Sequence, residues 1–325
     1  MTPMLRSLCV FSFLLLLLPA ASVAQVGNTP RPAPTTPIIG ILSAMTLEIE
    51  TLGQELTDKT EMTVQGIRFA TGSLKGRRVV LTHSGMGKVN AAMAATLLVE
   101  QFQPTHVLFT GIAGGLNPDL RPGDVVIGAK TAYHDYGEWT PEGFRVGRTV
   151  DPFTGKPNPL FFPADAGLLA VAERAALDLK LAPVKTTSGE RTPRVVTGVI
   201  VTGDAFVASL AKKDALRKEF KADATEMEGA AVAQICWQRR VPCLILRSLS
   251  DSAGAKAQEN VLLFEKSAAQ NSSLLVTGIV ERLEAQTRRS SRGAAGEVRV
   301  RHQSHNSQAD RANDLAERVG ANGVR

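Results

Sequence analysis

The chain has 325 residues, 21% of them charged, and a formal net charge of +6, so it is long enough for one large domain or two small ones. Residues 286–325 alone carry +4 of that charge. The part expected to fold is therefore nearly neutral, and the basic composition does not indicate a nucleic-acid-binding face.

The first residues have the pattern of a secretory signal peptide. Arg6 precedes an apolar run over Leu8–Leu18, and Ser22-Val23-Ala24 forms a small-x-small cleavage site. Residues 25–37 are rich in Pro and Thr and are expected to form an extended linker. No later stretch approaches the roughly 20 apolar residues of a membrane helix. We expect an exported protein, periplasmic or secreted, without stable membrane insertion.

Residues 38–285 alternate short apolar runs with longer helical patterns, which predicts one layered α/β domain. Several expected strands are apolar throughout, as strands covered on both faces are. Strands are predicted over 38–42, 79–82, 106–110, 124–129, 195–202 and 241–246. Helices are predicted over 44–56, 89–102, 166–179, 208–220, 227–240 and 261–283.

Three regions do not fit that alternation. Residues 137–163 contain five prolines, four glycines, four phenylalanines and Trp139, which indicates a functional loop or a disordered insertion. The basic tail over 286–325 is polar and expected to be disordered. Cys236 and Cys243 lie in apolar contexts without metal-ligand spacing, so buried thiols are expected, with a disulfide after export as the alternative. No cluster implies a metal or an organic cofactor.

Acidic residues follow the expected strands, where α/β proteins bind ligands. Glu48 stands in the first turn of a helix, a place that favours a carboxylate whatever its function. Asp251 lies just beyond Arg247 at the end of a buried strand, although Asp also favours caps and turns. Glu226 and Glu228 begin a run of small residues, and a carboxylate packed so closely must be paired or put to use.

Two glycine-rich turns also follow expected strands, over Ser84–Lys88 and Thr110–Gly115. Glycine lets a ligand approach the backbone, and a helix N-terminus offers free N–H groups. Neither turn matches a Walker loop or a dinucleotide-binding fingerprint.

Together these segments resemble the 5′-methylthioadenosine/S-adenosylhomocysteine nucleosidases of the purine nucleoside phosphorylase superfamily. The resemblance runs in the family's order through Ile39–Met45 with Glu48, Ser84–Val89, Thr110–Leu116, Gly123–Val126, Thr202–Phe206, Glu226–Glu228 and Ser250–Asp251. It implies a three-layer α/β/α domain around a mixed central sheet, usually in a homodimer. It also implies hydrolysis of the N-glycosidic bond of an adenine nucleoside.

The resemblance assigns roles to particular positions. Asp251 is expected to protonate N7 of the leaving adenine, and Glu48 to activate the attacking water with help from Arg247. Glu228 is expected to bind the ribose hydroxyls, although a structural ion pair with an Arg is the alternative. The remaining substrate contacts are expected from Met227 against the sugar, Phe206 and the backbone of Val207 at the purine, and Ser250 beside the acid.

The chemistry of glycosidic cleavage agrees with these roles for Asp251 and Glu48. One group must protonate the leaving group, and another must place a water on the opposite face of the sugar ring. The turns supply Ser84 and Lys88 but no Arg, which favours water over phosphate. Ile112 is also expected among the substrate-binding residues, at a position where the family often has a residue with a hydroxyl group. His134 is expected to be structural.

Two further differences from the family pattern leave the substrate open. Aromatic residues of the 137–163 region are expected either to close over a 5′ alkylthio group or to restrict the site to adenosine. Val261 replaces an aromatic that often caps the site, with Phe264 one turn on. The alternatives to a nucleosidase are a phosphate-dependent phosphorylase and an exported nucleoside-binding or storage protein.

Overall fold

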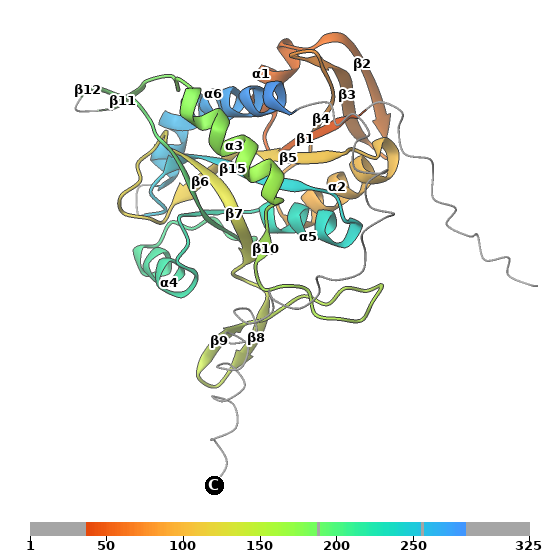
Figure 1. Cartoon of the computed structure of the whole chain (residues 1–325). Coiled ribbons are helices and arrows are strands. Elements are labelled where there is room, and N and C mark those ends of the chain that lie inside the picture. The colour runs from red at the N-terminus through yellow and green to blue at the C-terminus, as the bar shows by residue number, and fades with distance from the viewer. Residues whose placement is uncertain (1–36, 187–188, 255–256, 284–325) are drawn as a thin grey trace, which may run out of the picture. The chain divides into compact units, whose positions relative to one another are not determined.

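The structure of the protein is a computed structural model that describes residues 37–186, 189–254 and 257–283 (Figure 1). The predicted signal peptide and nearly all of the predicted linker and basic tail lie outside these residues. The helices are α1 (Thr46–Gln54), α2 (Lys88–Phe102), α3 (Ala166–Asp178), α4 (Leu210–Phe220), α5 (Gly229–Arg239) and α6 (Ala257–Arg282). None of them is long and apolar enough to cross a membrane.

Eleven strands form one mixed sheet in the order β10-β7-β13-β14-β6-β15-β5-β1-β4-β3-β2. In chain order they are β1 (Ile39–Ser43), β2 (Thr57–Val64), β3 (Ile67–Leu74), β4 (Arg77–His83), β5 (His106–Thr110), β6 (Ile112–Gly115), β7 (Val125–Tyr133), β10 (Phe162–Pro163), β13 (Val195–Thr202), β14 (Ala224–Glu226) and β15 (Cys243–Asp251). Two short hairpins stand apart, β8 (Gly137–Thr140) with β9 (Gly143–Val146) and β11 (Val184–Thr186) with β12 (Gly189–Arg191).

The sheet closes on itself around its longest strand. β15 runs parallel to β5 and β6 and also pairs antiparallel with β7, at Ser248 opposite Val125. The pairings β7–β13, β13–β14 and β14–β6 complete a ring of five strands. This ring brings the ends of β14 and β15, which carry acidic residues, to either side of the short strand β6.

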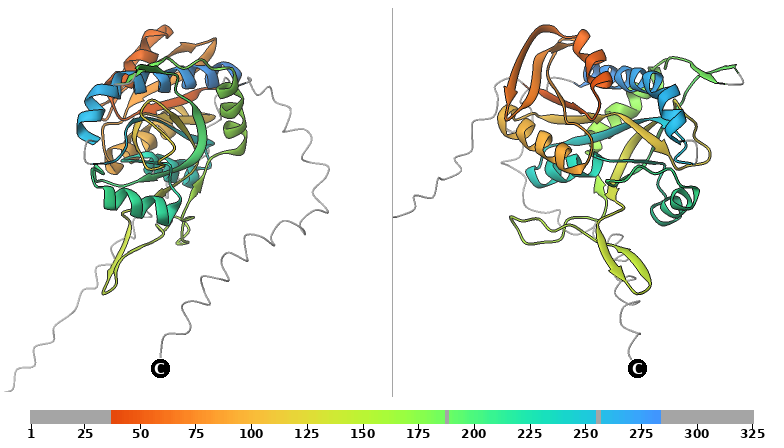
Figure 2. Two further views of the ribbon diagram at one scale, coloured as in Figure 1. Left: turned by 90° about the vertical axis from the view of Figure 1, so that its left-hand side faces the viewer. Right: turned by 180° about the vertical axis from the view of Figure 1, so that it is seen from behind.

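Helices cover both faces of the sheet, which gives three layers (Figures 1 and 2). On one face, α1, α3 and α6 bury Leu52, Leu168 and Leu275 in a core with β1 and β4. On the other face, α2 and α5 pack their small residues, including Ala94 and Ala231, against the sheet. Burial on both faces explains the continuous apolar runs of the central strands and confirms the predicted fold class.

The predicted elements are in place, with boundary shifts, but the sequence prediction missed several strands. β2 and β3 form a hairpin at the sheet edge, and β2 is almost fully exposed. The 137–163 region is more regular than expected, because it contains β8, β9 and β10. The helix predicted over 227–240 starts two residues later, because Glu226 ends β14 and α5 begins at Gly229 after the N-cap Glu228.

The β8–β9 hairpin projects from the body of the domain (Figures 1 and 2). Trp139 at its tip is 83% exposed and packs edge-on against Phe144, 5.4 Å between ring centroids. The indole of Trp139 is therefore open to solvent on the projecting hairpin.

The two cysteines of the domain are free thiols, as the sequence favours. Cys236 of α5 is buried and Cys243 at the start of β15 is partly so. Hydrogen bonding with the Cys236 thiol, together with burial, raises the pKa of Cys243 well above its usual value.

Candidate active site

Four buried carboxylates and one buried arginine meet at the carboxyl edge of the sheet. Glu48 comes from the first turn of α1, Glu226 from the end of β14, and Glu228 from the N-cap of α5. Arg247 and Asp251 both come from β15. Each is at most 6% exposed, so the cost of burying these charges requires a network of partners.

Glu48 has one satisfied and one free oxygen. Its Oε2 accepts a hydrogen bond from the hydroxyl of Ser43, the last residue of β1. Its Oε1 is buried and has no hydrogen-bond partner within the described part of the chain. Burial raises the pKa of Glu48 above its usual value, while the Ser43 bond and the charge of Arg247 oppose the rise.

Arg247 is held by Glu226 rather than by Glu228. Its Nη2 lies 2.5 Å from Glu226 Oε2 and 3.6 Å from Glu228 Oε2. The guanidinium carbon also stacks over Phe109, 4.2 Å from the ring centroid. Glu226 accepts further bonds from the hydroxyl of Thr202 and from the Gly229 N–H at 2.7 Å. Arg247 therefore pairs most closely with Glu226, and Glu228 lies at the outer limit of an ion pair with the same guanidinium.

Glu228 is left with few partners. Its Oε1 accepts one hydrogen bond from the backbone N–H of Gly87, at 2.8 Å. Burial, followed by the nearby charge of Glu226, raises the pKa of Glu228 to about 7, against the opposing effect of Arg247. A carboxylate held in this way can accept hydrogen bonds from a ligand or carry a proton near neutral pH.

Asp251 lies at the end of β15 with both oxygens bonded. Oδ1 accepts from the Ala253 N–H at 2.6 Å, and Oδ2 accepts from the Ser250 hydroxyl at 2.9 Å. Burial raises the pKa of Asp251, and these two bonds and the charge of Lys213 oppose the rise. Gly114 lies against the carboxylate, since a Cβ there would come within 3.0 Å of Oδ1.

A small cavity borders Asp251. Its volume is about 30 Å³, enough for a water molecule or two but not for a purine ring. Phe206, Val207 and Met227 line it, in agreement with their expected places at one site. Phe206 is 52% exposed and Val207 is buried. The Phe206 side chain therefore lines the cavity and is also in contact with solvent.

Ile112 contributes its backbone to the site. It opens β6 and is half-buried, and a backbone hydrogen bond from it lowers the pKa of Glu48. Its side chain offers no polar group. The neighbouring Gly111 is required by crowding, because a Cβ would come within 3.0 Å of Arg247 Nη1 and 3.3 Å of Glu48 Oε2.

An ion network fixes the turn that supplies the Gly87 N–H. Lys88 Nζ lies 2.7 Å from Asp135 Oδ1 and 3.6 Å from Asp204 Oδ2. The backbone N–H of Lys88 donates to Asp204 Oδ1 at 2.8 Å, and the Asp204 N–H donates to Asp135 Oδ2 at 2.8 Å. Gly87 itself has φ 91°, a conformation that favours glycine. The network joins this turn to the segment that carries Phe206.

His134 fills space beneath the same segment. It is 3% exposed, and neither ring nitrogen has a hydrogen-bond partner among the described residues. A Cβ at Gly203 would come within 2.5 Å of His134 Nε2. Burial lowers the pKa of His134. These facts agree with the structural role expected for it.

The structure thus brings together nearly all of the residues expected at the site. The side chain of Val261 lies outside the described residues, and Phe264 is half-buried. Sequence reasoning missed the roles of Ser43, Glu226 and the Lys88 network. The Lys88 turn and Asp204 lay within recognised segments, but nothing in their spacing shows that they pair.

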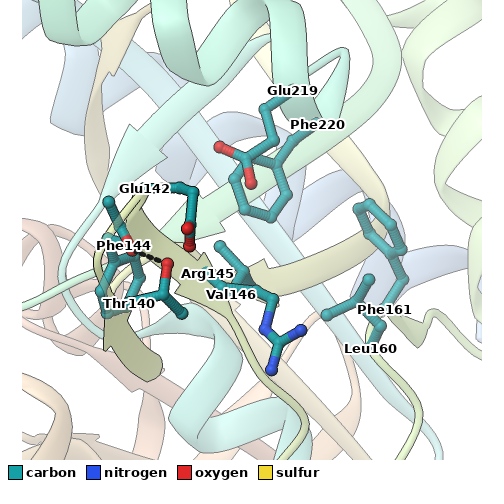
Figure 3. Close-up of a pocket in the computed structure, with 10 residues that line it drawn as sticks. Thr140, Glu142, Phe144, Arg145, Val146, Leu160, Phe161, Glu219 and Phe220 are labelled. Carbon is teal, nitrogen blue, oxygen red and sulfur yellow. Dashed lines mark hydrogen bonds between the residues drawn. The ribbon is translucent and has the colours of Figure 1, made fainter. Parts of the chain in front are cut away.

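A second cavity lies away from the carboxylates. It has a volume of about 510 Å³ between the β8–β9 hairpin and the end of α4, where Glu219 and Phe220 face Phe144 and Phe161 across the opening (Figure 3). None of the four buried carboxylates lines it. Among the described residues, no group of three or more His, Cys, Asp or Glu side chains is placed to hold a metal ion.

Comparison with known proteins decides the family. The model of the phosphorylase superfamily matches residues 38–281. A 5′-methylthioadenosine/S-adenosylhomocysteine nucleosidase from Psychromonas ingrahamii is 39% identical over 246 residues, which are 75% of this chain and 99% of the relative. The chain belongs to this nucleosidase family of the phosphorylase superfamily.

Solved structures of the family have the same fold. The nucleosidase from Colwellia psychrerythraea, in complex with adenine, superposes with a TM-score of 0.67 at 34% identity, covering 78% of this chain and 99% of that one. The futalosine hydrolase of Helicobacter pylori superposes with a TM-score of 0.66 at 31% identity, covering 76% and 99%. Family members with these names therefore share one architecture.

Proposed function

We propose that the protein hydrolyses the N-glycosidic bond of 5′-methylthioadenosine, S-adenosylhomocysteine or a related adenine nucleoside, giving adenine and the free sugar. The observation that carries this proposal is the unpartnered Oε1 of Glu48, buried beside Arg247. A buried carboxylate oxygen without a donor is a place for a bound water, and a carboxylate can take a proton from that water as it attacks.

Asp251 supplies the acid on the purine side. Its raised pKa favours the protonated form, which is the form needed to donate to N7 of the leaving adenine. Ser250 donates a hydrogen bond to the carboxyl, and the position of Phe206, Val207 and Met227 around a cavity beside Asp251 supports a purine site there. Phe206 stacks on the ring, and the backbone of Val207 binds its edge.

Glu228 binds the ribose hydroxyls. Positive charge develops on the sugar in an oxocarbenium-like transition state, so an adjacent carboxylate contributes more there than in the ground state. The raised pKa of Glu228 is consistent with a carboxylate that gains hydrogen-bond donors only when the substrate binds. Met227, next in sequence, packs against the sugar.

Hydrolysis is favoured over phosphorolysis by the state of Lys88. A phosphate site needs free cationic donors, but Lys88 is already paired with Asp135 and Asp204. Arg247 is likewise paired, with Glu226. Both candidate cations near the glycine-rich turns are therefore committed to carboxylates.

A homodimer is supported by an apolar row on α2. Met86 in the preceding turn is 66% exposed, and Val89 and Met93 on the helix are 80% and 47% exposed. Trp237 of the neighbouring α5 is 47% exposed. Large apolar side chains grouped on one surface favour burial against another protein surface, and a second copy of the chain presents the same row.

Export is supported by the N-terminal sequence alone, through Arg6, the apolar run Leu8–Leu18 and the Ser22-Val23-Ala24 site. Cell fractionation with N-terminal sequencing of the mature protein tests it. A periplasmic or secreted chain that starts at Gln25 is expected, and a cytoplasmic chain that retains residue 1 contradicts it.

The function is tested by adenine release from 5′-methylthioadenosine, S-adenosylhomocysteine, adenosine and futalosine, without and with phosphate. Release of adenine and free sugar without phosphate is expected. Turnover only with phosphate would show a phosphorylase, and nucleoside binding without turnover would show a binding protein.

A further inference from the structure

Thr225 carries a buried hydroxyl that no group in the described part of the chain satisfies. The residue is the middle one of β14 and is 6% exposed, and its Oγ1 has no hydrogen-bond partner among the described residues. A buried hydroxyl without a partner lowers stability, and a valine of the same shape would avoid that cost. The hydroxyl is therefore explained best by a partner that arrives with a ligand.

The position of Thr225 distinguishes it from other buried threonines. Thr131 in β7 and Thr277 in α6 also have a hydroxyl without a partner among the described residues. Neither of them lines the cavity beside Asp251, whereas Thr225 does. Of these three hydroxyls, the one on Thr225 is thus placed where a ligand is expected.

The register of the sheet puts the Thr225 side chain on the same face as the carboxylate of Asp251. Gly114 of β6 pairs with Thr225 on one side and with Asp251 on the other. Residues directly opposite each other in an antiparallel pair have their side chains on one face, with Cβ atoms about 5 Å apart. A Cβ at Gly114 would come within 3.0 Å of Asp251 Oδ1. The glycine therefore leaves an open gap between the hydroxyl and the carboxylate.

Both polar groups belong to strands of the sheet, whereas Phe206 lies in the irregular segment between β13 and α4. A purine fits beside Asp251 only once that segment has moved, because the cavity measures about 30 Å³. Thr225 and Asp251 need not move for the ring to enter. Together they form a polar pair that is in place before the base binds.

The chemistry of the base indicates which of its atoms meets the hydroxyl. The proposed function places Asp251 at N7 of adenine. On the ring edge beside N7, the neighbouring polar group is the amino group at C6, since C8 on the other side carries only hydrogen. A threonine hydroxyl has two lone pairs and can accept a hydrogen bond from an amino group.

We propose that the Thr225 hydroxyl accepts a hydrogen bond from the C6 amino group of the bound purine. This contact makes Thr225 a residue that determines the preference for the base, without contact with the bond that breaks. The inference rests on the proposed function, because it concerns the base of that substrate.

The test compares kcat/KM for two nucleosides in wild type and Thr225→Val, which keeps the shape and removes the hydroxyl. The nucleosides are 5′-methylthioadenosine and its analogue with hydrogen in place of the C6 amino group. For 5′-methylthioadenosine a fall of roughly five- to thirtyfold is expected. It appears mainly in KM, because substrate and transition state share the contact. For the analogue the value stays within about twofold of wild type.

Two further comparisons separate the hydroxyl from the packing. Thr225→Ser keeps the hydroxyl and Thr225→Ala does not, so the serine variant is expected to retain the higher kcat/KM for 5′-methylthioadenosine. Thr131→Val, which removes an equally buried hydroxyl away from the cavity, is the matched control and should leave both substrates within about twofold. Equal losses for both nucleosides in Thr225→Val, or a serine variant no better than the alanine variant, overturn the proposal.

Binding of the free bases adenine and purine, measured by calorimetry, separates this proposal from the function itself. If the wild type hydrolyses neither nucleoside, the proposed function is wrong. Loss of affinity for adenine but not for purine in Thr225→Val then still supports the contact. Equal affinity of wild type and variant for adenine, or a wild type that binds neither base, refutes it.

Discussion

Replacing Glu228 by Gln is expected to stabilise the free protein at alkaline pH while it removes activity. The pKa of Glu228 is raised from the usual 4.5 to about 7 in the folded protein, first by burial and then by the charge of Glu226. Glu48 raises it slightly further, and Arg247 and the Gly87 N–H act in the opposite direction. The folded state therefore resists ionisation of this carboxyl.

The sign of the pH effect follows from proton uptake. Between pH 4.5 and about 7 the folded protein holds a proton on Glu228 that the unfolded chain has released, so stability falls as pH rises through this window. Below the window both states are protonated and the difference disappears. Raising the pKa of Glu228 from 4.5 to about 7 corresponds to a loss of about 3 kcal/mol of stability above pH 7.

Urea unfolding of wild type and Glu228→Gln at pH 4.5 and pH 8 measures this difference. The variant is expected to gain about 3 kcal/mol relative to wild type on going from the lower to the higher pH. Thr225→Val, a neutral change at a buried hydroxyl without a partner in the described structure, is the control and should show the same effect at both values. A pH-independent difference for Glu228→Gln would refute the reasoning.

Other variants test the acid, the ion network and the dimer. Asp251→Asn is expected to lower kcat in adenine-release assays by about 10²–10⁴-fold with little change in thermal unfolding. Asp204→Ala removes the acceptor of the Lys88 N–H; we expect kcat/KM to fall roughly tenfold and amide exchange at Gly87 to accelerate. Val89→Glu is expected to convert a dimer to a monomer in sedimentation equilibrium.

Each of these has a contrary result. Turnover by Asp251→Asn close to wild type would remove the acid role from that residue. Asp204→Asn retains an acceptor oxygen and should recover most of the activity lost in the Ala variant; equal losses in both would show that charge, not the hydrogen bond, matters. A wild type that sediments as a monomer, or a Val89→Glu variant that remains a dimer, contradicts the interface on α2.

The fold was predictable because the central strands carry long apolar runs and the helices have small or apolar faces. The edge of the sheet was not predictable from the sequence. Strand β2, with Thr57, Lys59 and Glu61, has exposed side chains and no alternation of apolar and polar residues, so its sequence does not differ from that of a loop. Strand β14 could not be predicted from the sequence for another reason. Its three residues end in Glu226, and the small residues that follow merge with the pattern of α5.

The site was predictable as a set of residues but not as a network. Glu226 and Glu228 are two positions apart, and both precede the same small residues. Only the structure shows that Arg247 lies closer to Glu226, at 2.5 Å, than to Glu228, at 3.6 Å.

The small volume of the cavity beside Phe206 has a kinetic consequence. With about 30 Å³ available, a purine fits only once the segment around Phe206 has moved, and we expect this movement to precede binding. In stopped-flow experiments the observed rate of adenine binding should level off at high adenine concentration, at the rate constant of that opening. Inhibitors that bind the open conformation would then have the same maximal association rate and would differ in their dissociation rate constants.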